Sequence, residues 1–289
     1  MKYIIFPDIH GRSFWKDTVE AYKDIDEKIT YIFLGDYLDP YSYEEISMQN
    51  AIDNFKDILK FQLESKDNVV LLLGNHDLHY ISTAVHPGSR FSYQYENEIH
   101  KIFKDALEGN NLLQMTYECR VNGKLFLFSH AGILMGWVNK NKKKLFEKWQ
   151  YEELGLDEKD IDSYKLLPSF NYMFESKIYR EAFLSTMNDV SIFRGGSSSD
   201  GSMVWADWHE FITENPLPGI VQVFGHTQQE QDPININDSF YCLDVRRPFL
   251  LSEEGIITEI DGRNIPQINV EEEQEKLKKY LDRLSAFFF

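Results

Sequence analysis

Five short apolar runs, each rich in β-branched or aromatic residues, constrain the fold of this chain most strongly. Runs of this length and composition are typical of strands that are covered on both faces. In the first half of the chain they alternate with helical patterns, and this alternation predicts an α/β sheet with crossover helices. The five runs are Tyr3–Phe6, Ile29–Leu34, Val69–Leu73, Leu125–Phe128 and Ile220–Phe224.

The helical patterns lie between the first strands. Apolar residues recur at helical spacing within 15–22, 52–63 and 95–106, which predicts amphipathic helices there. Asn122-Gly123 separates an alternating run that ends at Val121 from Leu125–Phe128. Asn-Gly between two such runs predicts a β-hairpin.

The second half of the chain has a different organisation. Residues from about 136 to 190 show no strand pattern and predict a helical insertion. Closely spaced runs at Phe240–Val245, Pro248–Leu251 and Ile256–Ile260 predict a second, antiparallel sheet. We expect a single domain over 1–270, followed at 271–289 by a charged helix and an aromatic tail, Phe287-Phe288-Phe289, that docks on the body or meets another subunit.

Charge and composition exclude several classes of protein. The formal net charge is −17, so a nucleic-acid partner is disfavoured. No apolar run approaches the roughly 20 residues that span a membrane. Cys119 and Cys242 lack the paired spacing of a zinc site, and two buried thiols in a reducing cytoplasm are the simplest interpretation. The sequence therefore predicts a soluble cytoplasmic protein.

Polar residues of the metal-ligand type follow every one of the five apolar runs. Because the carboxyl ends of strands in an α/β sheet share an edge, we expect these residues to converge. Carboxylates, imidazoles and an amide oxygen suit manganese, iron or zinc. The five segments are Asp8-Ile9-His10-Gly11, Gly35-Asp36-Tyr37-Leu38-Asp39, Gly74-Asn75-His76-Asp77, Ser129-His130-Ala131-Gly132 and Gly225-His226-Thr227.

Taken together, these segments resemble the calcineurin-like metallophosphoesterase superfamily over residues 8–227. Gly35–Asp39 and Val204–Asp207 look most like the phosphoprotein Ser/Thr phosphatases, whereas Gly74–His79 and His130–Ile133 look like the symmetrical diadenosine tetraphosphatases. The chain therefore lies between the two branches. The resemblance implies an α/β fold with a β-sandwich of two mixed sheets flanked by helices. It also implies two divalent metal ions, with manganese ahead of iron or zinc.

The resemblance also assigns roles to individual residues. His76 would be the general acid that protonates the leaving group, oriented by Asp39; the alternative is that His76 only supports the metal ligands. His79 and His86 either line a substrate pocket or serve as surface or capping residues. The metal ligands would be Asp8 and His10 for the first ion, Asp36 as the bridge, and Asn75, His130 and His226 for the second.

Two arginines of the phosphoprotein phosphatase pattern are missing. Pro40 and Leu73 occupy their positions, so the cations that bind phosphate must come from elsewhere. Arg194, in a glycine-rich segment, and Arg246 are the candidates. An ordinary salt bridge is the alternative for each.

The expected function is hydrolysis of phosphomonoesters by direct attack of a metal-bound hydroxide. The substrate would be a phosphorylated protein, as for the Ser/Thr phosphatases, or a small phosphorylated molecule. The first alternative is a dinucleoside polyphosphate hydrolase of the diadenosine tetraphosphate type. A non-catalytic binding scaffold is a remote alternative, because no ligand and no acid is missing. The sequence leaves the oligomeric state open.

Overall fold

The computed structural model describes residues 2–25, 28–65, 68–110, 112–145, 167–216 and 219–288. The middle of the predicted helical insertion, residues 146–166, lies outside the described residues. Phe289 and the side chains of Phe287 and Phe288 also lie outside them, so the docking of the aromatic tail stays a prediction. Among the described residues, no helix combines the length and the apolar character that crossing a membrane requires.

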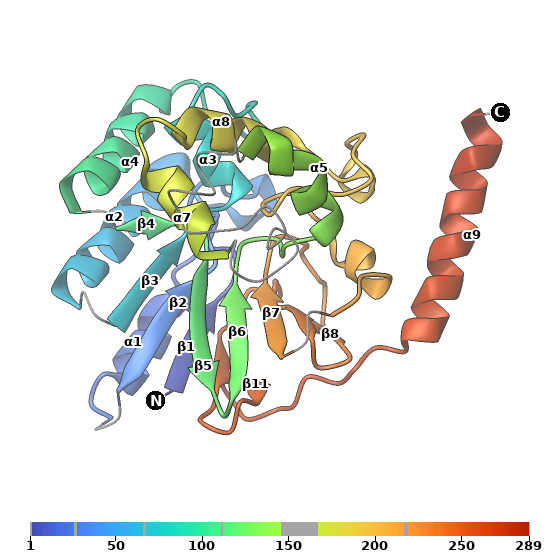
Figure 1. Ribbon diagram of the computed structural model, residues 1–289. Helices are drawn as coiled ribbons and strands as arrows, with labels where there is room; N and C mark the ends of the chain where they lie inside the picture. The colour runs from blue at the N-terminus through green and yellow to red at the C-terminus, as the bar shows by residue number, and fades with distance from the viewer. Residues whose placement is uncertain are drawn as a thin grey trace.

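The first sheet has six strands and carries the N-terminus of the chain (Figure 1). Strands β1 to β4 are parallel, while β10 is antiparallel to β1 and β11 is antiparallel to β10. In spatial order the strands are β11 (Ile257–Glu259), β10 (Phe249–Leu251), β1 (Lys2–Phe6), β2 (Ile29–Phe33), β3 (Val69–Leu72) and β4 (Leu113–Gln114).

The second sheet has five strands, of which β6, β7 and β9 are parallel. The predicted hairpin is confirmed: β5 and β6 are antiparallel, and Asn122 and Gly123 adopt φ angles of 47° and 78° at the turn, as a type I′ turn requires. In spatial order the strands are β5 (Tyr117–Val121), β6 (Lys124–Phe128), β7 (Ile220–Phe224), β9 (Phe240–Cys242) and β8 (Ile234–Ile236).

The two mixed sheets form a sandwich, which confirms the expected fold class. One apolar core lies between the sheets and includes Ile5 and Phe126. Ile4 and Phe6 alternate with Ile5 along β1 and belong to a second core, which the helices cover. Because both faces of a strand such as β1 are buried, its sequence is apolar without interruption.

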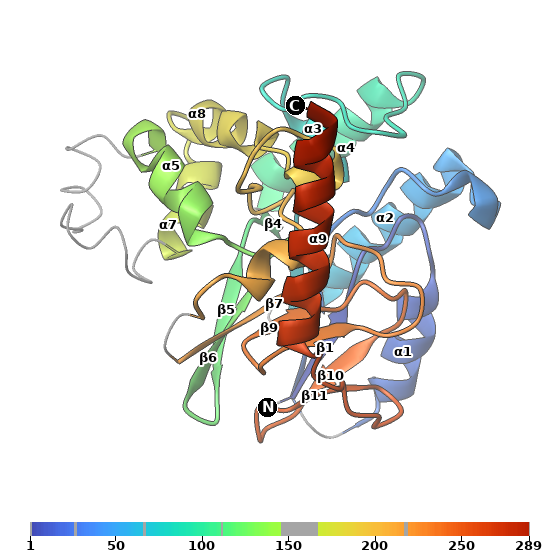
Figure 2. The same cartoon turned by 90° about the vertical axis from the view of Figure 1, so that its right-hand side faces the viewer.

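Helices cover the outer faces and the top of the sandwich (Figures 1 and 2). The three predicted helices correspond to α1, α2 and α4, whereas the short α3, which carries part of the candidate site, was not predicted. Helix α9 runs along the outside of the body in both views and is linked to it by Gln274, whose side chain donates to the carbonyl of Ile212. The α-helices are α1 (Phe14–Tyr22), α2 (Met48–Glu64), α3 (Asn75–Ile81), α4 (Glu96–Asn110), α5 (Met135–Leu145), α7 (Leu167–Glu175), α8 (Arg180–Ser185) and α9 (Val270–Phe288); short 3₁₀ helices are η1 (Ser42–Glu44), η5 (Thr186–Asn188), η6 (Ile192–Arg194) and η7 (Trp208–Ile212).

The prediction of a separate antiparallel sheet after residue 240 was wrong. Strand β9 joins the second sheet in parallel to β7, and the chain then crosses to the first sheet, where β10 pairs with β1. Leu250 lies opposite Ile4 in this pairing. Closely spaced strands and turns indicate that strands exist, but their partners depend on which sheet edges the rest of the chain leaves unpaired.

Candidate metal centre

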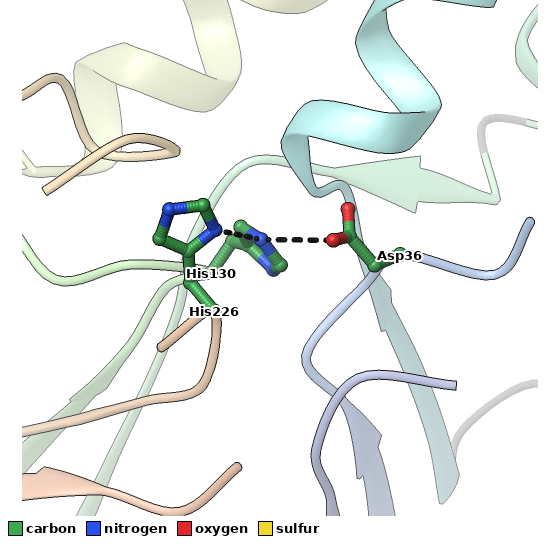
Figure 3. Close-up of side chains that lie close together, drawn as sticks. All are labelled: Asp36, His130 and His226. Atoms are coloured by element: carbon green, nitrogen blue, oxygen red, sulfur yellow. Dashed lines mark hydrogen bonds and ion pairs between the residues drawn. The ribbon is translucent and has the colours of Figure 1, made fainter. Parts of the chain in front are cut away.

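Loops at the carboxyl ends of five strands bring the six predicted metal ligands together. All six side chains are buried. Oxygen and nitrogen atoms of Asp8, His10 and Asp36 form one group, and those of Asp36, His130 and His226 form another; within each group they lie within 4.8 Å of one another. Figure 3 shows the second group, with His130 between Asp36 and His226.

Asp36 belongs to both groups. Its Oδ2 atom lies 3.5 Å from His10 Nε2 and 3.5 Å from His130 Nε2. Its Oδ1 atom accepts a hydrogen bond of 2.9 Å from the backbone N–H of His76. One carboxylate oxygen is thus held by the backbone, and the other faces a histidine on either side.

The first group presents its donors in the form that a metal requires. Nδ1 of His10 donates to the carbonyl of Leu38 at 2.7 Å, which leaves the lone pair on Nε2. Burial lowers the pKa of His10 to about 3, so the ring is neutral. Asp8 Oδ2 lies 4.0 Å from His10 Nε2, while Asp8 Oδ1 accepts from the backbone N–H of His226 at 2.9 Å.

The second group is arranged in a similar way. Nδ1 of His130 donates to the carbonyl of Leu34 at 2.8 Å. Nε2 of His130 then faces Asn75 Oδ1 at 3.1 Å and His226 Nδ1 at 3.2 Å. Burial, and after it the charge of Arg194, hold the pKa of His226 well below its ordinary value. Nε2 of His130 and Nδ1 of His226 therefore face each other beside Asn75 Oδ1.

The donor set fits two divalent cations. Metal bonds of about 2.1 Å place neighbouring ligand atoms about 3 to 3.5 Å apart, which matches the spacing around His130 Nε2. Among the described residues, no hydrogen-bond partner is found for the buried atoms His226 Nε2 and Asn75 Nδ2. Oxygen and imidazole ligands without a thiolate suit manganese, iron or zinc.

Backbone strain concentrates at this centre. His10, Asp36, Asp39 and His226 have φ angles of 43°, 53°, 54° and 65°, in the left-handed region that costs energy for residues other than glycine. The sharp turns aim these side chains inward. A Cβ atom at Gly74 would collide with the Asp36 carboxylate, so only glycine allows this close approach.

His76 and Asp39 lie together beside the first group. Asp39 Oδ2 lies 2.8 Å from His76 Nδ1 and 2.8 Å from His79 Nε2, and Asp39 Oδ1 accepts from the hydroxyl of Tyr80 at 2.6 Å. Burial favours the neutral acid, but these donors outweigh it and lower the pKa of Asp39. Asp39 is therefore an ionised acceptor for three side chains.

His79 is not a surface residue, which was one of the alternatives expected from the sequence. It is buried, and its Nδ1 accepts from the backbone N–H of Gly88 at 3.1 Å. The tautomer that results donates from Nε2 to Asp39. His79 is thus a buried partner of Asp39, whereas His86 is exposed and its backbone N–H donates to Asn188.

The two candidate arginines have different neighbours. Arg194 Nη1 is 3.9 Å from Asp207 Oδ2, and its charge reaches His226. Arg246 Nε lies 3.4 Å from Glu44, and its Nη2 donates to the hydroxyl of Tyr43 at 2.6 Å. Each arginine therefore has an acidic neighbour, which agrees with the alternative of an ordinary salt bridge.

Sequence reasoning missed Arg90. Its Nη2 atom lies 3.1 Å from His76 Nε2 and 3.5 Å from His10 Nε2. Residue 90 belongs to the loop between α3 and α4, outside all five segments, so no spacing rule identifies it. The signal in the sequence was only indirect: Pro40 and Leu73 occupy the positions of two expected arginines, so the cations that bind phosphate had to come from another segment.

The fold and its buried donor set define a metal-dependent enzyme. The sequence matches the calcineurin-like phosphoesterase family over residues 1–230, and the chain belongs to this family. It is therefore a metal-dependent phosphoric-ester hydrolase, and a non-catalytic scaffold is not supported. No curated protein matches the chain significantly.

Several solved structures are similar to the chain at low sequence identity. A cold-active protein-tyrosine phosphatase from a psychrophilic Shewanella species is 14% identical, with a TM-score of 0.47 and coverage of 90% of this chain and 80% of that one. A protein serine/threonine phosphatase from Saccharomyces cerevisiae is 13% identical, with a TM-score of 0.47 and coverage of 92% and 77%. A putative diadenosine tetraphosphatase is 15% identical, with a TM-score of 0.40 and coverage of 93% and 94%.

Proposed function

We propose that the protein hydrolyses phosphomonoesters, either phosphoserine and phosphothreonine in proteins or a small phosphorylated molecule. Water would attack phosphorus directly, without a covalent enzyme intermediate. The observation that carries this proposal is the place of His76, which is held by Asp39 and lies beside a pair of donor groups that share Asp36. A nucleophile site and an acid for the leaving group are thereby adjacent.

The residues that would hold two ions are those of the two donor groups. Asp8 and His10 would bind the first ion, Asn75, His130 and His226 the second, and Asp36 would bridge them, with manganese ahead of iron or zinc. Bound ions would supply the positive charge that activates water and offsets the negative charge on phosphate oxygens.

His76 is proposed to donate a proton to the leaving oxygen. Its Nδ1 is engaged by Asp39 at 2.8 Å, so Nε2 is the nitrogen that is left for the substrate. The Asp39 carboxylate fixes the orientation of the ring. A general acid of this kind contributes about 10²- to 10⁴-fold to the rate.

Arg194 is proposed to bind substrate on the side of the second donor group. Its charge contributes to the low pKa of His226, which supports a place near the centre. Arg246 remains the second candidate, although its contacts with Glu44 and Tyr43 occupy part of its guanidinium.

A dinucleoside polyphosphate is the alternative substrate, and one surface feature favours it. Tyr43 is 62% exposed, and its ring centroid lies 5.2 Å from that of Tyr41, which in turn contacts His10 edge-on. An exposed aromatic ring beside a phosphate site can stack on a nucleobase. This surface would give a dinucleotide a contact that a phosphoserine peptide lacks.

Rates on three substrates test the proposal: a phosphoserine peptide, diadenosine tetraphosphate and a mononucleotide, each with manganese in excess. The proposal predicts the fastest turnover on one of the monoesters and none after removal of the metal. A clear preference for the dinucleotide would favour the alternative. The His76→Asn variant serves as control, because residual phosphatase activity equal to that of the parent would indicate a contaminant.

A cytoplasmic location is also proposed. Cys119 and Cys242 are both buried and unpaired, which supports a reducing compartment. The partner would be a phosphorylated protein or a small phosphorylated substrate.

A further inference from the structure

We propose that Arg90 is a substrate-binding residue that grips phosphate oxygens on the side of the centre formed by His10 and His76. This inference rests on the proposed phosphoesterase function and names a residue that the sequence motifs do not contain. It follows from the position, charge and anchoring of the side chain.

The guanidinium of Arg90 is fixed in orientation. Its Nε donates to the carbonyl of Asp39 at 2.9 Å, and its plane lies over the ring of Tyr41, with Cζ 3.8 Å from the ring centroid. A ring and a carbonyl hold a guanidinium without neutralising its charge. Nη2 then faces the nitrogens of His76 and His10.

Arg90 is the unpaired member of an arginine cluster around Tyr41. Arg12 and Arg246 also approach this ring, but each forms an ion pair with Glu44, at 2.9 Å and 3.4 Å. Within the described part of the chain, no carboxylate lies within 4.0 Å of the Arg90 guanidinium. An arginine without an acidic partner is unexpected in a protein of net charge −17, and it suits an incoming anion.

Arg90 Nη2 now faces the ring nitrogens of His10 and His76. In the working enzyme, other groups would occupy these nitrogens. When His10 Nε2 binds a metal, its lone pair no longer accepts a hydrogen bond. In the proposed mechanism, His76 Nε2 faces the leaving group of the substrate and is engaged by it. Nη2 of Arg90 would then need another acceptor at the same place. A phosphate group fits this requirement because a guanidinium can donate two parallel hydrogen bonds to two of its oxygens.

The loop that carries Arg90 is anchored at both ends. The Gly88 N–H donates to His79 Nδ1, and the Ser92 N–H donates to the hydroxyl of Tyr80 at 2.8 Å. Asn188 of η5 accepts from the His86 N–H at 2.8 Å and donates to the carbonyl of Ala84 at 2.7 Å. Helix α3 and the short helix η5 therefore both hold this loop in place.

The backbone of Arg90 adds an independent observation. Its φ angle is 65°, in the left-handed region that a long side chain rarely adopts. Strain of this kind persists where the surroundings enforce it, and it clusters at ligand sites. Asparagine tolerates the same region, so Arg90→Asn removes the guanidinium without a backbone penalty.

Binding of inorganic phosphate to the manganese-loaded protein tests the proposal, measured by calorimetry together with metal content and kinetics on a phosphomonoester. We expect Arg90→Asn to raise the phosphate Kd and the KM at least 10-fold with unchanged metal content, and free guanidinium ion to restore part of the loss. Arg90→Lys should recover the charge but not the paired hydrogen bonds. Arg12→Lys is the matched control, because Arg12 approaches the same ring but is paired with Glu44.

The outcomes separate this inference from the proposed function. If the parent hydrolyses phosphomonoesters and Arg90→Asn binds phosphate as the parent does, the Arg90 proposal is overturned and the function stands. If the parent binds phosphate through Arg90 but hydrolyses none of the substrates, the function fails instead. Equal losses in Arg90→Asn and Arg12→Lys, without guanidinium rescue, would indicate a structural role and would also overturn the proposal.

Discussion

The carboxylate of Asp77 accepts a hydrogen bond of 2.7 Å from the backbone N–H of Asp36. The same Oδ2 accepts from Gly74 at 2.8 Å, and Oδ1 accepts from Tyr37 at 3.0 Å. The buried Asp77 thus joins the loop after β2 to the loop after β3. It holds the backbone at the point where Asp36 turns toward the two donor groups.

We predict that Asp77→Asn loosens both loops. The amide keeps one acceptor oxygen but turns an NH₂ group toward a backbone donor, which leaves a buried N–H unpaired at a cost of about 1–3 kcal/mol. Metal affinity should fall about 10- to 100-fold, as for other residues that support ligands. Thermal unfolding with and without manganese measures both effects, and a parent-like response to manganese would argue against this coupling.

The two histidines on Asp39 should differ in their effects on catalysis. His76→Asn should lower kcat about 10²- to 10⁴-fold on alkyl phosphates, and less on nitrophenyl phosphate, whose leaving group needs no proton. His79→Phe removes one of the partners that orient Asp39, so a loss of about 10-fold is expected. Equal losses of His76→Asn on alkyl and aryl phosphates would count against an acid role.

Because of Glu210, the free energy of unfolding of the protein should decrease as the pH rises. Burial raises its pKa to about 7, above the ordinary value of 4.5 for the unfolded chain. Between these values the unfolded state releases the proton first, so the free energy of unfolding decreases with pH, by up to about 3 kcal/mol, and levels off above pH 7.

The Glu210→Gln variant isolates this contribution. An amide does not titrate, so the free energy of unfolding of the variant should not fall between pH 5 and pH 8 through this residue, whereas that of the parent should. The stability of the parent relative to the variant should therefore decrease toward pH 8. Denaturant unfolding at four pH values checks this, and parallel profiles for the two proteins would contradict it.

Arg194→Lys should raise KM or lower kcat several-fold without changing metal content or melting temperature, because lysine keeps the charge but loses the planar pair of donors. Arg246→Lys, whose side chain also contacts Glu44, should have the smaller effect. Steady-state kinetics of both variants decide the matter. If Arg246→Lys changes KM or kcat and Arg194→Lys does not, Arg246 is the substrate-binding residue instead.

The sequence predicted the parts of the fold that depend on local pattern. The strands before Asp8, Asp36 and His130 are apolar because both of their faces are buried. Asp8 and Asp36 lie close together because β1 and β2 are parallel neighbours, whereas His130 follows a strand of the second sheet, which the sequence pattern did not predict. The pairing of β10 with β1 escaped prediction because strand partners depend on distant segments. Arg90 escaped for the same reason, since a loop outside every motif brings it to the centre.

The metal content of Asp36→Asn tests the central claim most directly, namely that one carboxylate serves two ions. Asp36 Oδ2 lies 3.5 Å from a histidine of each group, so loss of its charge should weaken both sites at once. Elemental analysis of the purified proteins should give two metal ions per parent chain and fewer than one per variant chain, with activity lost in parallel. A variant that retains two tightly bound ions and full turnover would contradict the account.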